Sequence, residues 1–445
     1  MPFDRAAEPR VDDGRWRNGI VMMTKPNERA RKADLLNSSM LPRTGPPERD
    51  SSRARLLRQL RRHGSMARVE LGRRMGLSAA AVSTITSDLI GNGVFVESAD
   101  EPTAENVRGR PPVNLQFNAA YARVAAASLR MNVVDAVVAD FAGRILVREQ
   151  FPCSTRSLSG DEVIAQCAMA VDTVLSRAPG PPPSAIGLAV QGIIDPAVGR
   201  QIWSPILSIR DTEFVSPLTD HFGVPIVMEN DATATALAAA QLVPDLRQGL
   251  VGVLMVGHGV GMGLLVDGGP FPGTRGASSE IGHVRRQPAG AQCRCGQRGC
   301  IEAYLADYAL YRDARTIANL SMTSHQQPSE QQMSELVKRA EEGEPHVVSL
   351  FREAGVALSD AVRVVASVLG PDRIAITGSA LRAFHLMQPT FKQGLQELRI
   401  PTLEPAQDVV IVPGGTELIV AGMVHLALER VDMSIAVEAS VQAAS

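Results

Sequence analysis

From about residue 121 onward, apolar residues recur with two periods, one typical of buried strands and the other of helices. Short, nearly continuous apolar runs predict strands at 133–139, 145–147, 186–190, 225–228, 251–256 and 374–377. Apolar residues at helical spacing predict helices at 161–175, 232–241, 347–369 and 417–430. Because strands alternate with helices, residues 119–433 are predicted to form an α/β domain.

Residues 51–118 follow a different pattern, with three helical stretches before two β-like runs. The first stretch, 53–62, places leucines 56, 57 and 60 on one face. Ser65 is predicted to cap a second helix that runs to residue 74, and Gly76 to turn the chain after it. Ser78 is predicted to cap a third helix whose apolar residues 82, 85 and 89 point into a core. Runs 94–97 and 113–117 are predicted to pair as a hairpin.

This order of elements predicts a winged helix–turn–helix, in which the third helix enters the major groove of double-stranded DNA. Small residues on its outward face can approach base edges closely, but none is Arg, Lys, Asn or Gln, so bidentate base readout is poor. The candidate groove contacts are Ser78, Ala79, Ala80, Ser83, Thr84 and Ser87. The candidate phosphate contacts are Arg68, Arg73 and Arg74.

The charge distribution supports a nucleic-acid module. The whole chain has a net charge of −2, but residues 1–118 carry +6 and the remainder −8. Residues 51–75 contain eight arginines and one acid. A basic front end on an acidic body favours DNA binding, although a three-helix protein-interaction domain is the alternative.

The predicted wing loop contains Arg108, Gly109 and Arg110, followed by proline. Glycine permits close approach and the two arginines sense the negative potential of a narrow A·T minor groove. The loop is similar to an AT-hook core, and the alternative is a solvated basic loop.

The ends of the chain carry no predicted globular structure. Residues 1–50 mix charged residues and proline without an apolar period, which predicts a disordered tail, and 434–445 are predicted to be a C-terminal tail. The sequence contains no stretch typical of a transmembrane helix and no evident signal peptide, so a cytoplasmic location is expected.

The strongest chemical signal lies between residues 280 and 302. It contains Glu-Ile-Gly-His followed by Cys-x-Cys-Gly-x-x-Gly-Cys-x-Glu. Three thiolates and one imidazole make a closed tetrahedral set for a structural Zn²⁺; the alternative is a group of buried reduced cysteines. The predicted ligands are His283, Cys293, Cys295 and Cys300.

Taken together, these motifs resemble the ROK family of repressors and sugar kinases. The resemblance covers nearly everything from residue 51 onward, and a helix–turn–helix ahead of the cysteine element is similar to the regulator branch. It implies an actin-like, ribonuclease H-like fold with two α/β lobes and a cleft between them.

The resemblance also implies a sugar site. The run 191–195 is similar to the family's Pro-Gly-x-x-Asp with Gln191 in place of proline, and 229–232 matches Glu-Asn-Asp-Ala. By resemblance, the sugar hydroxyls would be bound by Asn230, Asp231, Glu280, His283 and Glu302. The alternative for the Asn-Asp pair is a helix N-cap, and both roles can hold together.

The phosphate-binding elements of the family's kinases are not retained. Asp231 is present at the position of their general base. Their Asp-x-Gly-Gly-Thr element, however, aligns with residues 128–132, where the acid and both glycines are lost. His258 replaces the usual threonine of the second phosphate turn. We therefore expect the sugar pocket to survive and the ATP site to be lost.

These observations predict a sugar-responsive transcriptional regulator, more specifically a repressor. Its partners would be double-stranded operator DNA and a sugar or sugar phosphate, and it would be a homodimer or homotetramer. One alternative is an active ATP-dependent sugar kinase with an appended DNA-binding module. The other is a DNA-binding protein whose body serves only for dimerisation.

Overall fold

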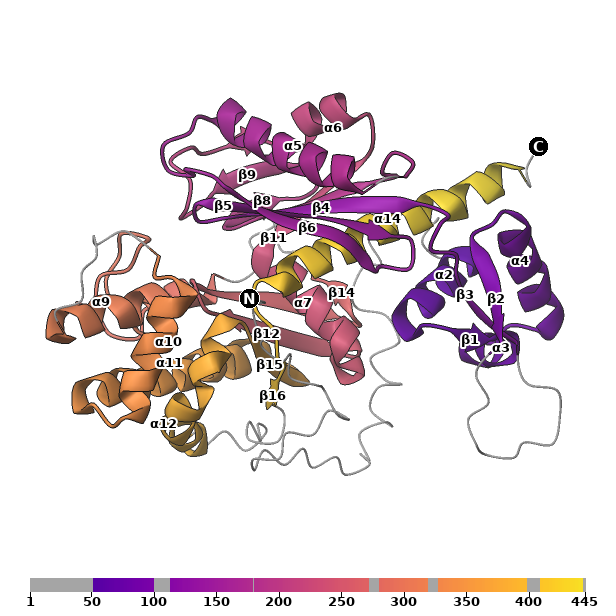
Figure 1. The fold of residues 1–445 in the computed structure, drawn as a ribbon. Coiled ribbons are helices and arrows are strands. Elements are labelled where there is room, and N and C mark those ends of the chain that lie inside the picture. The colour runs from indigo at the N-terminus through magenta and orange to yellow at the C-terminus, as the bar shows by residue number, and fades with distance from the viewer. Residues whose placement is uncertain are drawn as a thin grey trace, which may run out of the picture. The chain divides into compact units, whose positions relative to one another are not determined.

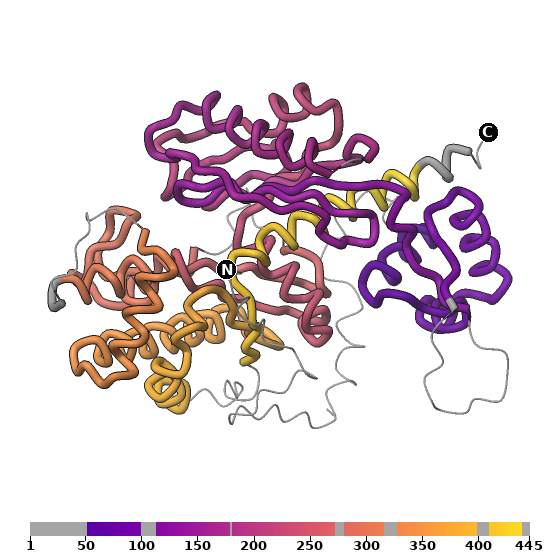
Figure 2. Tube along the Cα trace, viewed as in Figure 1, coloured from indigo at the N-terminus to yellow at the C-terminus, as the bar shows by residue number. Residues whose placement is uncertain are grey.

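The computed structural model describes residues 51–99, 113–178, 180–271, 280–318, 327–397 and 409–442 (Figures 1 and 2). The predicted N-terminal tail and the loop residues Arg108, Gly109 and Arg110 lie outside these ranges, so the structure does not test them.

The described part of residues 51–118, which we call the basic segment, contains the predicted helices and hairpin in the predicted order. Its elements are α2 (Ser52–His63), β1 (Met66–Ala67), α3 (Arg68–Met75), α4 (Ala79–Gly91), β2 (Phe95–Ala99) and β3 (Val113–Phe117). The three strands pair antiparallel in the order β1-β3-β2. The side chains of Ser51 and Ser78 cap α2 and α4 by accepting backbone N–H bonds.

Two details of this segment differ from the prediction. Ser65 does not cap the second helix, because Met66 and Ala67 first pair with β3 and the helix begins only at Arg68. In α4, Val82 and Leu89 are buried, whereas Ile85 is only half-buried. Thr86 is buried beside it, since its hydroxyl is satisfied by donating to the Val82 carbonyl at 2.8 Å.

The first lobe is built on a five-stranded sheet in the order β11-β7-β4-β5-β6. Its strands are β4 (Arg123–Arg130), β5 (Val133–Asp140), β6 (Ile145–Pro152), β7 (Ile186–Val190) and β11 (Ile226–Asn230). Helix α5 (Gly160–Arg177) packs on β5 and β4, as its apolar spacing predicts. A small sheet of β8 (Ile193–Asp195), β9 (Arg200–Trp203) and β10 (Thr212–Glu213) and helix α6 (Val215–Phe222) complete the lobe.

The second lobe has a sheet in the order β14-β13-β12-β15-β16. The strands are β12 (Leu250–Val256), β13 (Val260–Val266), β14 (Gly269–Pro270), β15 (Arg373–Thr377) and β16 (Val409–Ile411). Its helices are α7 (Asp231–Leu242), α8 (Glu302–Leu305), α9 (Asp307–Ala318), α10 (Glu330–Glu341), α11 (Pro345–Leu369) and α12 (Phe384–Gln396). The described residues of this lobe also form the short 3₁₀ helices η3 (Pro244–Arg247), η5 (Ile281–His283) and η6 (Ser379–Ala383).

Helices α7 and α14 (Glu417–Gln442) pack against each other between the two sheets (Figure 1). Helix α7 contacts β12 and β13, while α14 contacts β4 and β7. The same α14 also contacts α2 of the basic segment. None of the described helices is long and apolar enough to cross a membrane.

The prediction of a C-terminal tail at 434–445 is wrong over the described residues, because α14 continues to Gln442. Ile435 and Ala436 are buried in the core that also contains Leu57 of α2. The helix therefore continues past residue 433 because Ile435 and Ala436 pack in the same core as apolar residues of the basic segment. The apolar spacing over 417–430, on which the prediction rested, did not reveal this packing.

Candidate metal centre and adjoining cleft

The four predicted metal ligands come together. One ligand atom each from His283, Cys293, Cys295 and Cys300 lies within 4.8 Å of all the others. The Cys295 and Cys300 sulfurs are 3.8 Å apart, and the Cys293 sulfur is 3.6 Å from His283 Nδ1. Tetrahedral zinc with ordinary bond lengths separates two sulfurs by about 3.8 Å and a sulfur and a nitrogen by about 3.6 Å. The donor set and its spacing fit a zinc ion.

The backbone of this loop needs its glycines. Gly296 and Gly299 have φ of 91° and 80°, in the left-handed region that favours glycine. A Cβ on Gly299 would also lie 1.7 Å from the Gln287 carbonyl oxygen, which no side chain can tolerate. The loop is closed by bonds from the Cys293 N–H to Gln297 O at 2.9 Å and from the Gly296 N–H to Cys293 O at 3.1 Å.

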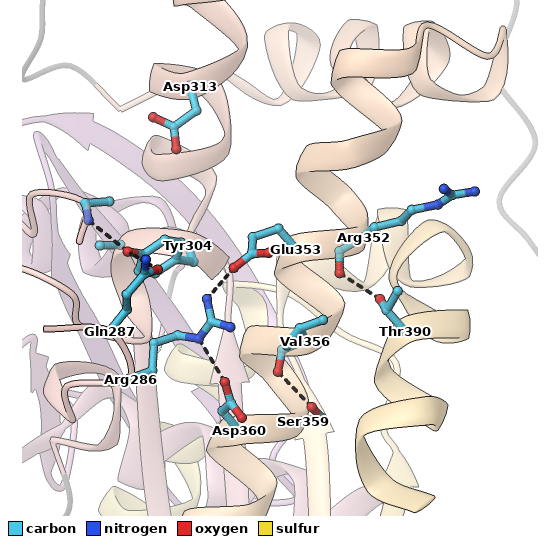
Figure 3. Close-up of polar contacts among 12 residues, drawn as sticks. Arg286, Gln287, Tyr304, Asp313, Arg352, Glu353, Val356, Ser359, Asp360 and Thr390 are labelled. Atoms are coloured by element: carbon cyan, nitrogen blue, oxygen red, sulfur yellow. Dashed lines mark hydrogen bonds and ion pairs between the residues drawn. The ribbon is translucent and has the colours of Figure 1, made fainter. Parts of the chain in front are cut away.

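The loop is also fastened to the second lobe from outside (Figure 3). Arg286 donates to the Asp360 carboxylate of α11 at 2.8 Å, pairs with Glu353, and lies 4.8 Å from the Tyr304 ring centre. The Tyr304 hydroxyl donates to Gln287 Oε1 at 3.0 Å and accepts from a loop N–H at 2.8 Å. These contacts hold the loop against α11 independently of any ion.

Next to this loop lies a half-open cleft whose space, including the solvent at its mouth, is about 410 Å³. All five side chains expected to bind sugar line it: Asn230, Asp231, Glu280, His283 and Glu302. His283 directs Nδ1 toward Cys293 and places Nε2 3.5 Å from Glu280. Because its two nitrogens face opposite partners, one imidazole can serve the metal and the cleft together.

Asn230 is an N-cap as well as a cleft residue. Its Oδ1 accepts from the N–H groups of Ala232 at 2.8 Å and Thr233 at 3.2 Å, and its Nδ2 donates to Gly192 O at 2.7 Å. The alternative role considered for this residue is therefore present. Since the cap uses the carbonyl oxygen, only the remaining amide proton is left for a ligand.

Burial changes the acid–base state of the cleft. Desolvation, reinforced by the nearby Glu280 carboxylate, raises the pKa of Asp231 to about 7. Burial also raises the pKa of Glu280 and brings that of Glu229 to about 7. Hydroxyl donors from a ligand would replace the lost water and favour the ionised carboxylates.

The family model described as "ROK family" matches residues 131–430. This chain belongs to the ROK family. Among similar proteins, the transcriptional dual regulator NagC of Escherichia coli K12 is 23% identical over 76% of this chain and 83% of its own length. The xylose repressor of Caldicellulosiruptor bescii is 23% identical over 71% of this chain and 79% of its own.

Solved structures give the same fold. A ROK family transcriptional regulator described as a homologue of E. coli MLC superposes with a TM-score of 0.69 at 22% identity, covering 86% of this chain and 98% of the other. A ROK hexokinase from Thermus thermophilus superposes with a TM-score of 0.54 at 26% identity, covering 69% and 97%. The ROK fold thus occurs in structures described as a regulator and as a kinase, so the fold does not by itself choose between them.

In this ROK chain, three further residues belong to the site. Gln191 lines the cleft. The Trp203 ring meets His283 edge to face with centroids 6.0 Å apart. The Tyr308 hydroxyl donates to Glu302 Oε1 at 3.1 Å, while the Val260 N–H donates to Glu302 Oε2 at 3.1 Å. Tyr308 and Trp203 belong to no motif, so the sequence analysis missed them. Gln191 was noted only because it stands where the family motif has proline, and this departure was the one sequence signal for it.

The face expected to contact DNA is exposed on α4. Ala79, Ala80, Ser83, Thr84 and Ser87 are all exposed. The arginines expected to contact DNA phosphates also form hydrogen bonds and ion pairs within the protein. Arg68 donates to Thr86 at 3.0 Å and pairs with Glu97 at 2.8 Å. Arg73 and Arg74 both pair with Glu70 at 2.6 Å, although Arg73 remains 72% exposed.

We expect Asp231→Asn to flatten the dependence of stability on pH. Between pH 4 and 7 the folded state of the wild type holds a proton on Asp231 that the unfolded state has released, so this group's contribution to stability falls as pH rises toward 7. The asparagine does not titrate, so the variant lacks this loss. Between pH 5 and pH 7, its free energy of unfolding should rise by about 2 kcal/mol relative to that of the wild type. Urea unfolding at both pH values measures it, and parallel pH profiles would contradict it.

Proposed function

We propose that this chain is a sugar-responsive transcriptional regulator, acting as a repressor. The observation that carries the proposal is a polar cleft, lined by carboxylates, an amide and an imidazole, in the same chain as a helix with a small-residue exposed face. Similar proteins described as an N-acetylglucosamine repressor and as xylose repressors support it. Binding to genomic DNA would place the protein in the cytoplasm.

The basic segment would bind double-stranded operator DNA as a winged helix–turn–helix. Helix α4 would enter the major groove, with Ser and Thr hydroxyls and alanine methyl groups reading base edges. The loop with Arg108, Gly109 and Arg110 would follow the minor groove of A·T-rich flanks. A symmetric homodimer or homotetramer would match two half-sites.

The metal loop would hold a structural Zn²⁺ through His283, Cys293, Cys295 and Cys300. The bound ion would supply only cross-linking, because four protein ligands leave no open coordination position. Tyr308 donates to Glu302 and lies 3.6 Å from the Cys293 sulfur, so it links the metal loop to the cleft. Glu280, His283 and Glu302 would then be oriented for sugar hydroxyls by the loop.

A packed path leads from the cleft to the basic segment. Helix α7 begins with Asp231 in the cleft and packs along α14, and α14 contacts α2. A sugar can change operator affinity only if it binds one arrangement of these helices more tightly than another. We propose that α14 is the element through which this difference is transmitted.

The proposal is tested by operator titrations at fixed salt with and without each of a panel of sugars and sugar phosphates. At least one compound should shift operator affinity about fivefold or more, as expected for allosteric coupling. No response to any compound would favour the dimerisation-scaffold alternative. Sugar-dependent ADP formation that Asp231→Ala abolishes would establish the kinase alternative.

We expect Ser83→Glu to weaken operator binding by about tenfold or more, because the new carboxylate would bring negative charge into the major groove between the two phosphate backbones. Ser83 is exposed on α4. Ser176→Glu is the matched control, since Ser176 is an exposed serine on α5 of the first lobe. Gel-shift titration measures both variants, and equal affinities would show that α4 does not face the DNA.

A further inference from the structure

A second cavity, which we call the α2 cavity, lies beside α2 of the basic segment and shares no lining residue with the cleft. Its space, including the solvent at its mouth, is about 610 Å³. The lining includes four arginines, three from α2 and one from the last turn of α3. They are Arg55, Arg58, Arg62 and Arg74, and Gln59 and Asp267 lie among them.

The cavity follows from the polar face of α2. The three arginines and the glutamine of this helix stand at positions i, i+3, i+4 and i+7, so they share one face. The leucines of α2 are buried in the core of the basic segment instead. The helix therefore presents a row of side-chain N–H donors to the cavity, because arginine and glutamine side chains both carry them.

The charge of two of these arginines is not paired with a carboxylate. The Arg55 guanidinium donates to the Met75 carbonyl at 3.0 Å, and that of Arg62 donates to the Asp267 carbonyl at 3.3 Å. Among the residues that the structure describes, neither arginine forms an ion pair. Both guanidinium groups therefore keep N–H donors and a full positive charge for an anionic ligand.

The nearby acids offset only part of the positive charge. Asp267 lines the α2 cavity, but its Oδ1 accepts from the Gly249 N–H at 3.0 Å. Glu429 of α14 pairs with His425 at 3.4 Å. Despite its burial, the pKa of Glu429 is lowered by His425 and then by two arginines of α2, so it feels the same positive charge.

The effect on a neighbouring histidine shows that the field around the cavity is positive. Burial, and then the charges of Arg74 and Arg247, lower the pKa of His63 at the end of α2. Arg62 acts in the same direction, and Glu70 opposes them with a smaller effect. Because a positive field disfavours a further cation, it favours an anion in the same place.

We propose that the α2 cavity binds a diphosphate group, either free or carried by a nucleotide, with the arginines of α2 and Gln59 as donors. A diphosphate is multiply charged and rich in acceptor oxygens, which suits the planar fork of a guanidinium. Arg55 and Arg62 are seven residues apart, about 10 Å along the helix, so two linked phosphates match this row of donors better than one.

The position of the cavity favours a small ligand over operator DNA. Asp267 borders it from the turn between β13 and β14 of the second lobe, whereas the exposed face of α4 carries no such border among its described residues. A bound diphosphate would contact α2 next to this turn and so hold the basic segment against the second lobe. The site does not depend on the proposed sugar response.

The test is calorimetric titration of the full-length protein with pyrophosphate, ADP, GDP and inorganic phosphate at fixed ionic strength. At least one diphosphate compound should bind one to one, and inorganic phosphate should bind about tenfold more weakly or less. Arg55→Met and Arg62→Met should each weaken diphosphate binding about tenfold or more, as expected for a charged hydrogen bond. Arg55 is exposed, so Arg55→Met tests the site even if Arg62→Met fails to fold.

Arg352→Met is the matched control, because Arg352 is an exposed helical arginine on α11 (Figure 3) and its loss changes the net charge equally. The control should bind diphosphate within about twofold of the wild type. Loss in both cavity variants but not in the control supports the proposal, and comparison of pyrophosphate with the nucleotides then identifies the carrier.

Three other outcomes would overturn the proposal. Diphosphate binding that both cavity variants retain would place the ligand elsewhere, and an equal loss in the control would show a general effect of charge. No binding of any compound, with operator affinity reduced in both cavity variants, would assign these arginines to DNA. None of these results requires a response to sugar, so the proposed function stands or fails separately.

Discussion

Cys295→Ser is expected to lose the bound metal, lower the melting temperature and abolish the response to sugar together. Zinc binding to a closed Cys₃His site is worth about 10–16 kcal/mol in small peptides, and a site reduced to three ligands holds it far more weakly. The cleft should fail with the metal, because His283 is one of the proposed ligands and the Cys293 sulfur contacts the Tyr308 hydroxyl, which donates to Glu302. Elemental analysis should show one zinc per wild-type chain and almost none in the variant.

The rest of the protein should remain folded in that variant. Arg286 still fastens the loop to Asp360 and Glu353 of α11 (Figure 3), and each lobe keeps its own core. Cys153→Ser is the matched control, since Cys153 lies in the core of the first lobe, in a different cluster from the metal ligands. Unchanged zinc content in Cys295→Ser would contradict the ligand assignment, and equal zinc loss in the control would point to general unfolding.

Arg61→Met is expected to destabilise the protein by about 3–5 kcal/mol, because it leaves the Asp432 carboxylate buried without its partner. The two side chains form a 2.8 Å ion pair and are 6% and 5% exposed. Arg61 also lies 3.7 Å over the Phe117 ring centre, and burial raises the pKa of Asp432, so part of the cost should disappear at low pH. Chemical denaturation followed by circular dichroism measures the loss.

Two controls isolate the buried pair. The double variant Arg61→Met, Asp432→Leu should recover most of the loss, since two apolar residues can replace a buried pair at little cost. Arg53→Met changes the same helix but breaks a contact to Asp88, which is 46% exposed, and should cost less than about 1 kcal/mol. Similar losses of stability for Arg53→Met and Arg61→Met would show that burial of the ion pair does not determine the size of the loss.

If this pair is as strong as expected, the basic segment is held to α14 by a contact that can be weakened selectively. In operator titrations, Arg61→Met should then reduce the fold-change in operator affinity that the sugar causes. Operator affinity without sugar should change less. Such a result would identify α14 as the element linking the cleft to α2.

Much of the molecule could be predicted from local sequence. The metal ligands are close together along the chain, so their spacing alone predicts a tetrahedral set, and the glycines between them permit the turns. The strand at 186–190 coincides with β7, and the predicted helix 347–369 lies within α11, because long or fully buried runs have a clear period. Ser65 was wrongly predicted as a cap because β1 is only two residues long and depends on pairing with distant β3.

The sequence by itself predicted the order of elements, the candidate metal-ligand set and the loss of the kinase glycines, since each is a local pattern of residue types, and the resemblance to the ROK family added the five candidate sugar residues. Only the tertiary structure decided that α14 continues past 434 in contact with the core of the basic segment, and that Tyr308 joins Glu302 to the metal loop. The contact of α14 joins residues far apart in the chain, and the contact of Tyr308 depends on how the metal loop folds back onto α9. No local period or spacing encodes either contact; both follow from how the two sheets and their helices pack.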